Sequence, residues 1–389
     1  MKIISEPGCH VFKLVALFPI GRNLESKRGL VQSVAAMMKK STQKKTNKRL
    51  HEWLDKYSIQ IEIFSTPTHF TAELYCHVQF LNQAVPIFFE ILFQAKFIKT
   101  HWRIVRDQTM SFIEQQMKQT DFWADKLLSE HLLGKQHPLG YYSCPKDYTH
   151  INLEDIEHFY KEFLQTCKPQ FFLAGDNTAD ALKLVNIELK NYRFLIRTKR
   201  KSISIEQNLP QMIERKLTAT AQASVRLGQL FERKSFQDFQ NLELLNIFLG
   251  GHYMSELMKL LRVELGLTYG VYSNLNHFPG YSVFYIGFET DKKNVAVALD
   301  AISNLFIRLK KEMKLKIAES AKEYYSQWSK NGECSLQEIM YALRMKKLGY
   351  PYLDYVTWVN SLENLPKSAS ISIKSTIFDF SKYSKTVVY

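Results

Sequence analysis

The residues whose types and spacing are best suited to chemistry are Arg262 and Tyr269, which stand seven positions apart in the second half of the chain. Both side chains are hydrogen-bond donors, one charged and one phenolic. Apolar residues recur at helical spacing before Arg262, Gly266 suits a left-handed helix cap, and the segment after it favours extended chain. The sequence therefore predicts that Arg262 lies on the last turn of a helix and Tyr269 on the strand that follows.

An earlier apolar helix, within Leu244 to Leu249, must turn into this one at Gly250 and Gly251. Glycine can take backbone angles that are closed to other residues, so the chain can bend sharply there. One alternative for the whole segment is a buried helix–turn–strand unit with a surface arginine and a core tyrosine.

This segment resembles the second half of the pitrilysin/insulinase-type zinc metallopeptidases, the inverzincin family M16. The letters that agree at fixed spacing are Gly250, Gly251, Met254-Ser255, Leu257, Leu261, Arg262, Gly266, Leu267 and Tyr269. In that family an Arg/Tyr pair grips the substrate. The resemblance implies that Arg262 binds substrate carbonyls and that Tyr269 donates a hydrogen bond to the tetrahedral intermediate. It also implies that Gly250 and Gly251 let the substrate strand or neighbouring helices approach closely.

Active members of the family carry H-x-x-E-H on the first helix of the first half, where two histidines bind zinc and the glutamate activates a water. The matching helix here, residues 29–38, puts Gln32 on the first histidine, Ala35 on the glutamate and Ala36 on the second histidine. Zinc takes imidazole nitrogens and carboxylate or thiolate groups, whereas alanine has no ligand atom and glutamine offers only a neutral amide. We therefore expect no metal in this chain.

A replacement metal site is not evident elsewhere in the sequence. The third zinc ligand of the family aligns near residues 103–107, where Asp107 or the later Glu114 could stand, with nothing beside them to coordinate. His51 and Glu52 differ from an HExxH match by its last letter, and a solvent-facing helix is the default interpretation. The five cysteines are scattered without CxxC spacing, which favours free thiols in a reducing compartment.

The order helix, helix, strand, strand, apolar helix occurs twice along the chain, and such a long internal repeat is a strong architectural signal. We expect an α+β protein of two homologous halves, each an antiparallel sheet backed by helices, as the resemblance also implies. The expected boundaries are 1–192 for the first half, 193–210 for a basic linker and 211–389 for the second half. A last strand is predicted near residues 371–375.

Charge and hydropathy limit the other function classes. The 389 residues carry a formal net charge of +14, and the densest basic run is 39–49. That run has no interleaved aromatic residues, so a solvated face is favoured over nucleic-acid binding. No apolar run has the length of a membrane span. The first residues make a poor secretion signal, which favours the cytoplasm and leaves a periplasmic or organellar location open.

These observations favour a non-catalytic, substrate-binding subunit of a heterodimeric zinc metallopeptidase. The resemblance implies an H-x-x-E-H paralogue as partner, which would supply the zinc, and a peptide as substrate; a homodimer stays open. The alternative is a structural protein that reuses the fold without proteolysis, as the core subunits of a respiratory complex do.

Overall fold

The computed structural model describes residues 2–195, 205, 208–217, 222–312, 334–350 and 376–389. The predicted linker 193–210 falls mostly outside these residues, and the strand predicted near 371–375 falls wholly outside them.

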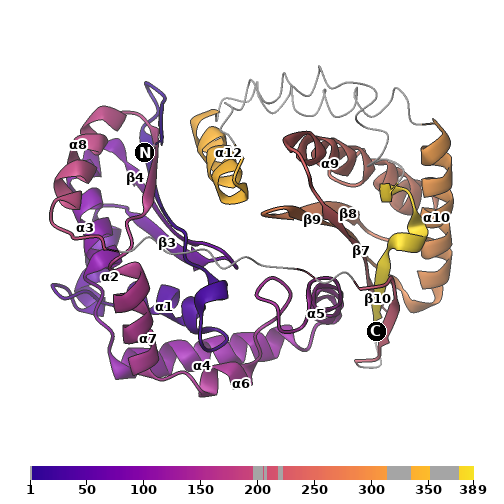
Figure 1. The fold of residues 1–389 in the computed structure, drawn as a ribbon, viewed down its shortest axis with the longest axis horizontal. Helices are drawn as coiled ribbons and strands as arrows, with labels where there is room; N and C mark the ends of the chain where they lie inside the picture. Colours follow the sequence, from indigo (N-terminus) through magenta and orange to yellow (C-terminus); the bar gives the residue numbers. More distant parts are fainter. Residues whose placement is uncertain (1, 196–204, 206–207, 218–221, 313–333, 351–375) are drawn as a thin grey trace. The chain divides into compact units, whose positions relative to one another are not determined.

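The described chain forms two five-stranded sheets of identical topology (Figure 1). The first has the order β1-β5-β2-β4-β3 and consists of β1 (Lys2–Ser5), β2 (Val11–Phe18), β3 (Gln60–Ser65), β4 (Phe70–His77) and β5 (Gln170–Gly175). The second has the order β6-β10-β7-β9-β8 and consists of β6 (Met212–Arg215), β7 (Gln222–Glu232), β8 (Val271–Phe278), β9 (Tyr281–Asp291) and β10 (Ser384–Val388). Adding five to every strand number converts the first order into the second, which confirms the predicted α+β fold with its internal repeat.

The sheets are antiparallel as predicted, apart from one parallel pair of strands at an edge of each. Strand β1 pairs in parallel with β5, and β6 pairs in parallel with β10, whereas the other pairings are antiparallel. Both parallel strands are only four residues long and lie at a sheet edge, so their pattern is too short to be recognised in the sequence.

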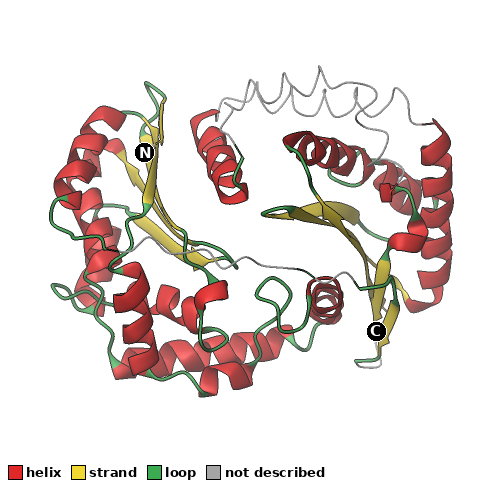
Figure 2. Ribbon diagram, viewed as in Figure 1, coloured by secondary structure: helices red, strands yellow, loops and turns green. Residues whose placement is uncertain are grey.

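Helices lie against both sheets (Figure 2). They are α1 (Leu30–Met38), α2 (Asn47–Lys56), α3 (Leu81–Phe93), α4 (Lys99–Gln116), α5 (Thr120–Leu133), α6 (Pro145–Thr149), α7 (Leu153–Phe159), α8 (Thr178–Leu189), α9 (Phe236–Leu249), α10 (Val295–Glu312) and α12 (Cys334–Leu348). Two segments are π-helical, Tyr160–Leu164 and Met258–Glu264. A capping box starts α7, in which the side chains of Asn152 and Asp155 accept hydrogen bonds from each other's backbone N–H at 2.8 Å.

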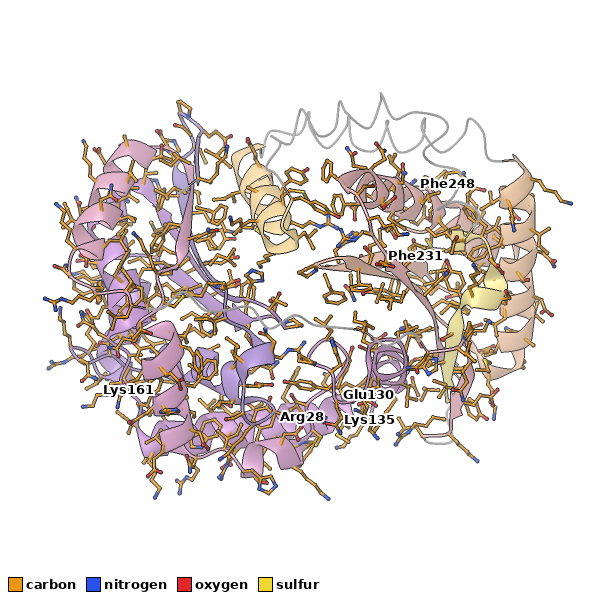
Figure 3. The ribbon with its side chains drawn as sticks, viewed as in Figure 1. Arg28, Glu130, Lys135, Lys161, Phe231 and Phe248 are labelled. Carbon is orange, nitrogen blue, oxygen red and sulfur yellow. The ribbon has the colours of Figure 1, made fainter. Side chains whose placement is uncertain are left out.

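Each sheet carries, on one face, a row of buried apolar side chains at alternate strand positions. In the first sheet Phe12, Leu14 and Phe18 of β2 are fully buried, and the ring of Phe18 lies 6.3 Å from that of Phe93 on α3. In the second sheet, β7 and β9 bury the corresponding row, and Phe248 of α9 is also buried (Figure 3). The members of that row are Ala223, Val225, Leu227, Phe284, Ile286 and Phe288.

The opposite face of the second sheet receives helix α5, although that helix comes from the first half of the sequence. It packs on β7 and β10, and Gly228 of β7 leaves room for the side chains of Leu128 and Leu132. The described part of segment 116–142 therefore belongs to the compact unit of the second sheet, whereas each sheet draws its strands from one sequence half.

Candidate functional site

Helix α1 carries the positions that align with the H-x-x-E-H motif. It begins after Gly29, whose φ of +84° is left-handed, and the Ser33 hydroxyl donates to the Gly29 carbonyl at 2.8 Å. Gln32 is exposed, and its amide oxygen accepts a hydrogen bond from the Tyr148 hydroxyl at 2.8 Å. Ala35 is buried and Ala36 is half-buried. The three positions therefore present one engaged amide oxygen and two methyl groups.

The surroundings of α1 do not fit zinc. Asp107 pairs with its neighbour Arg106 at 2.9 Å, and Glu114 is exposed on α4. Within the described residues, no group of three or more histidine, cysteine, aspartate or glutamate side chains is placed to hold a metal ion. The α4 side chains that share a cavity with Ala36 are Val105, Gln108, Thr109 and Phe112, none of which carries a carboxylate.

One titratable residue beside α1 escaped the sequence analysis. Glu25 accepts a hydrogen bond from the backbone N–H of Val31 at 3.2 Å, at the N-terminal end of the helix. Burial raises the pKa of Glu25 to about 7, although the Val31 N–H and the Arg22 guanidinium favour the charged form. An acidic residue four positions before a predicted helix was the available signal, because carboxylates favour helix N-termini.

Arg262 lies between two tyrosine rings. Its guanidinium carbon is 4.8 Å from the ring centre of Tyr269 and 5.0 Å from that of Tyr253, distances typical of cation–π contacts. The Tyr269 side chain is 89% exposed and Tyr253 is 62% exposed. Among the described residues no carboxylate pairs with Arg262, and no acceptor engages the Tyr269 hydroxyl. Both donor groups are therefore available to an incoming molecule.

These contacts correct part of the sequence interpretation. Tyr269 lies in the loop before β8, which begins at Val271, and not on a strand. Its exposure also contradicts the alternative of a core tyrosine. Tyr253, the second ring on Arg262, was missed because residues 251–255 are not helical and helical spacing does not predict their neighbours.

The helix that carries Arg262 widens into a π-helix over Met258–Glu264, where a regular α-helix was expected. Leu257, Met258 and Leu261 are buried and anchor it. Gly266 then has a φ of +59°, which confirms the predicted left-handed cap, and Leu267 N–H donates to the Leu261 carbonyl at 2.8 Å. π-Helical turns often occur at functional sites because they reorient side chains relative to a regular helix.

Threonine side chains fix the loop that carries Tyr269 to strand β9. The Thr268 hydroxyl contacts the Glu289 carbonyl at 2.6 Å and the Gly270 carbonyl at 2.8 Å. The Thr290 hydroxyl donates to the Leu267 carbonyl at 2.6 Å. The backbone on both sides of Tyr269 is therefore held, while its side chain stays exposed.

Gly250 and Gly251 are explained by close packing within the fold. A Cβ atom on Gly250 would lie 2.5 Å from the backbone nitrogen of Ser273, and one on Gly251 would lie 2.8 Å from the Cα of Ile247. The Ser273 N–H donates to the Gly250 carbonyl at 3.0 Å. Gly250 approaches β8 and Gly251 approaches the last turn of α9, which gives both glycines a structural role.

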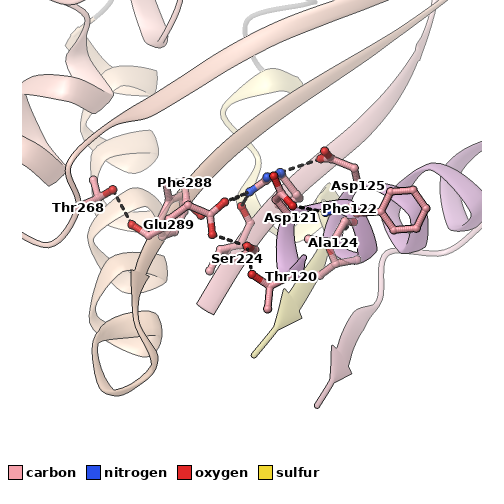
Figure 4. A network of polar contacts seen from close by, with 12 residues as sticks. Thr120, Asp121, Phe122, Ala124, Asp125, Ser224, Thr268, Phe288 and Glu289 are labelled. Atoms are coloured by element: carbon pink, nitrogen blue, oxygen red, sulfur yellow. Dashed lines mark hydrogen bonds and ion pairs between the residues drawn. The ribbon is translucent and has the colours of Figure 1, made fainter. Parts of the chain in front are cut away.

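Beside this loop, Arg226 of β7 forms the centre of a polar network (Figure 4). It bonds Asp125 of α5 at 2.7 Å and Glu289 of β9 at 2.9 Å, and Ser224 and Thr120 extend the network at 2.8 Å from each other. Burial raises the pKa of Asp125 although Arg226 lowers it. The network holds α5 against the sheet, and the charges of Arg226, Asp125 and Glu289 are paired with one another.

Comparison with known proteins shows which family the chain is similar to. Residues 150–325 match the family model described as Peptidase M16 inactive domain. The chain is 23% identical over 278 residues to the non-peptidase homolog YmxG of Helicobacter pylori. The match covers 70% of this chain and 63% of that protein, so it spans less than two thirds of the relative's length.

The family model and this relative together support the degenerate M16 family for this chain.

Several solved structures share its fold, and one of them is described as a peptidase M16 inactive domain. The peptidase M16 inactive domain from Pseudomonas fluorescens matches with a TM-score of 0.84 at 18% identity, over 99% of this chain and 94% of that one. A protease from Helicobacter pylori gives 0.86 at 14% identity, over 100% and 96%. The periplasmic protease PqqL from Escherichia coli gives 0.76 at 10% identity, over 99% of this chain and 43% of its own length.

Two further expectations concern membrane-spanning helices and the cysteines. None of the helices in the described residues is long and apolar enough to cross a membrane. The cysteines whose side chains the structure describes, Cys9, Cys76, Cys144 and Cys167, are free thiols.

Proposed function

We propose that this chain is the non-catalytic, substrate-binding subunit of a two-chain M16-type zinc metallopeptidase. Its partner would be an H-x-x-E-H paralogue that supplies the zinc and the base, and its substrate would be a peptide. The supporting observation is the Arg262 guanidinium, which is held between two exposed tyrosine rings without a carboxylate partner among the described residues.

The chemistry of the pair suits this role. An arginine without a carboxylate presents several N–H donors in a fixed plane, which can bind the carbonyl groups of an extended peptide. An exposed phenol on a held loop can donate a hydrogen bond to an oxygen that gains negative charge during hydrolysis. Such a donor stabilises the transition state more than the ground state and thereby raises turnover.

The test is reconstitution with the H-x-x-E-H paralogue of the same organism, followed by peptidase kinetics. Tyr269→Phe removes the donor and keeps the ring, so kcat should fall about 10²–10³-fold while the complex still assembles. Arg262→Ala should raise KM as well, because a charged donor already binds the ground state.

Tyr281→Phe is the matched control, since Tyr281 is a half-buried tyrosine of β9 in the same unit and makes no ring contact with Arg262. Its kcat should equal that of the unmodified complex. An unchanged kcat for Tyr269→Phe would remove the case for catalytic support. Failure of the two chains to co-elute, together with no gain in peptidase rate, would favour the structural alternative, a fold used without proteolysis.

A further inference from the structure

A cavity occupies the side of α1 on which a second zinc histidine would stand. Its volume is about 530 Å³, within the range of small-molecule sites. Ala36 lines it from α1, and its apolar wall is built from Leu54, Ile61, Ile91, Val105 and Phe112. These residues come from α2, β3, α3 and α4, all within the first compact unit. The small Ala36 side chain helps to leave this space open.

The polar groups of the cavity are mainly basic. Lys39, Lys40 and His51 line it, and no acidic residue does. The ammonium groups of Lys39 and Lys40 have no hydrogen bond or ion pair with any described residue. The basic run predicted as a solvated face therefore presents two free cations to an apolar cavity.

The loop that carries these lysines is held in place. Glu90, buried on α3, pairs with Lys45 at 3.0 Å and also accepts a hydrogen bond from Thr42. The Ser41 hydroxyl donates to the Lys96 carbonyl at 2.9 Å, and the Asn47 amide donates to the Lys40 carbonyl at 2.8 Å. The Glu90 carboxylate is thus engaged by Lys45 and Thr42, and the backbone at Lys40 is fixed beside the cavity.

We propose that this cavity binds a small amphipathic carboxylate with a single aliphatic chain, of the fatty-acid type. The carboxylate would lie at Lys39 and Lys40, and the chain would lie along the apolar wall from Ala36 toward Phe112. Charged donors are the groups that bind carboxylates most strongly, and an apolar wall without acidic residues excludes cationic ligands.

The lining favours an aliphatic chain over a buried peptide. Apart from the basic groups, the polar side chains are Gln108 and Thr109, and the Thr109 hydroxyl already donates to the Val105 carbonyl at 2.7 Å. A peptide backbone in this cavity would leave most of its N–H and C=O groups without partners, and each such buried group is costly.

The experiment is isothermal titration of the full chain with dodecanoate below its micellar concentration. We expect a dissociation constant on the order of 10–100 µM from ordinary ligand efficiencies. The Lys39→Ala/Lys40→Ala double variant should weaken binding roughly tenfold, since each lysine–carboxylate pair near the surface contributes modestly. Lys44→Ala/Lys48→Ala, which removes the same charge from residues that do not line the cavity, should bind as the unmodified chain does.

Ala36→Trp should fill the cavity and abolish binding. If that variant fails to fold by circular dichroism, Thr109→Trp enters the same space from α4 and replaces it. Equal binding by the filled variant, or equal loss in both lysine pairs, would overturn the proposal. So would equal affinity for dodecyltrimethylammonium. Displacement of dodecanoate by a short peptide with a C-terminal leucine would assign the cavity to peptide ends instead.

Discussion

A buried histidine predicts that the second unit loses stability in mild acid. His277 of β8 lies 2.6 Å from a carboxylate oxygen of Glu243 on α9 and 2.6 Å from the Ser282 hydroxyl. The same carboxylate accepts hydrogen bonds of 2.6 and 3.2 Å from Arg344 of α12. Burial lowers the pKa of His277 to about 4, although the hydrogen bond to Glu243 opposes this. Because Arg344 already neutralises Glu243, a charged His277 would add an uncompensated buried charge.

Proton linkage gives the direction in which the free energy of unfolding changes with pH. Well above pH 6.5, His277 is neutral in both the folded and the unfolded chain, so its protonation does not affect the free energy of unfolding. As the pH falls from 6.5 toward 4, the unfolded chain binds a proton that the folded chain refuses, and unfolding becomes more favourable. With a folded pKa of about 4 and an unfolded value of 6.5, the free energy of unfolding drops by about 2 kcal/mol between pH 8 and pH 5.

The assay is urea unfolding by circular dichroism at pH 8 and pH 5, for the unmodified chain, His277→Gln and His158→Gln. Glutamine at 277 keeps a donor for Glu243 and cannot titrate, so about 2 kcal/mol of the acid-induced loss should disappear. His158 is exposed on α7, and its replacement should leave that loss unchanged. The comparison between variants is necessary because Glu25 acts in the opposite direction: its raised pKa favours the folded state as the pH falls.

Two results would refute the reasoning. An equal acid-induced loss of unfolding free energy in His277→Gln and the unmodified chain would mean that the pKa of His277 is not lowered in the folded chain. A larger loss in His277→Gln would mean that His277 has a raised pKa and forms an ion pair with Glu243, so that its stabilising effect grows in acid.

The remaining predictions concern packing and charge in the same unit. Gly250→Ala should cost about 1–3 kcal/mol of unfolding free energy, because its Cβ would meet the Ser273 backbone at 2.5 Å. Gly270→Ala, where a Cβ meets open space, should change stability by less than about 0.5 kcal/mol. Arg226→Ala should lower the free energy of unfolding by about 2 kcal/mol through lost packing and hydrogen bonds. Asp125→Ala should lower it by about 1 kcal/mol, because Arg226 keeps its pair with Glu289. Urea unfolding of both variants and of the double variant measures the two losses and the coupling between the residues.

The sequence was sufficient for the features that depend on local pattern. The repeated order of elements predicted two equivalent sheets, and both are present. Gly266 predicted a left-handed cap, which its φ confirms, and Asn152 is a residue type typical of the helix start that it forms at α7. In each case the physical cause lies within a few residues of the signal, so no knowledge of the rest of the fold is needed.

The features that the sequence could not supply depend on residues far apart in the chain. Helix α5 packs on β7 at Gly228, which stands about a hundred positions later in the chain. The residue pattern of α5 alone does not indicate which strand it contacts. The cavity beside Ala36 needs walls from four elements. The ring of Tyr253 reaches Arg262 because the chain between them leaves regular helical geometry, so periodicity places it wrongly.

Folding alone does not account for the surface around Arg262. The helix is anchored by Leu257 and Leu261, which are fully buried, whereas Tyr253 and Tyr269 are mostly exposed. Holding two tyrosines around an arginine restricts three side chains and buries little apolar area, so it adds little stability. Tyrosine and arginine are, however, the residues that most often dominate binding energy. Helix α1 lacks zinc ligands while this pair stays accessible, and that contrast supports a chain that binds a substrate and leaves its cleavage to another subunit.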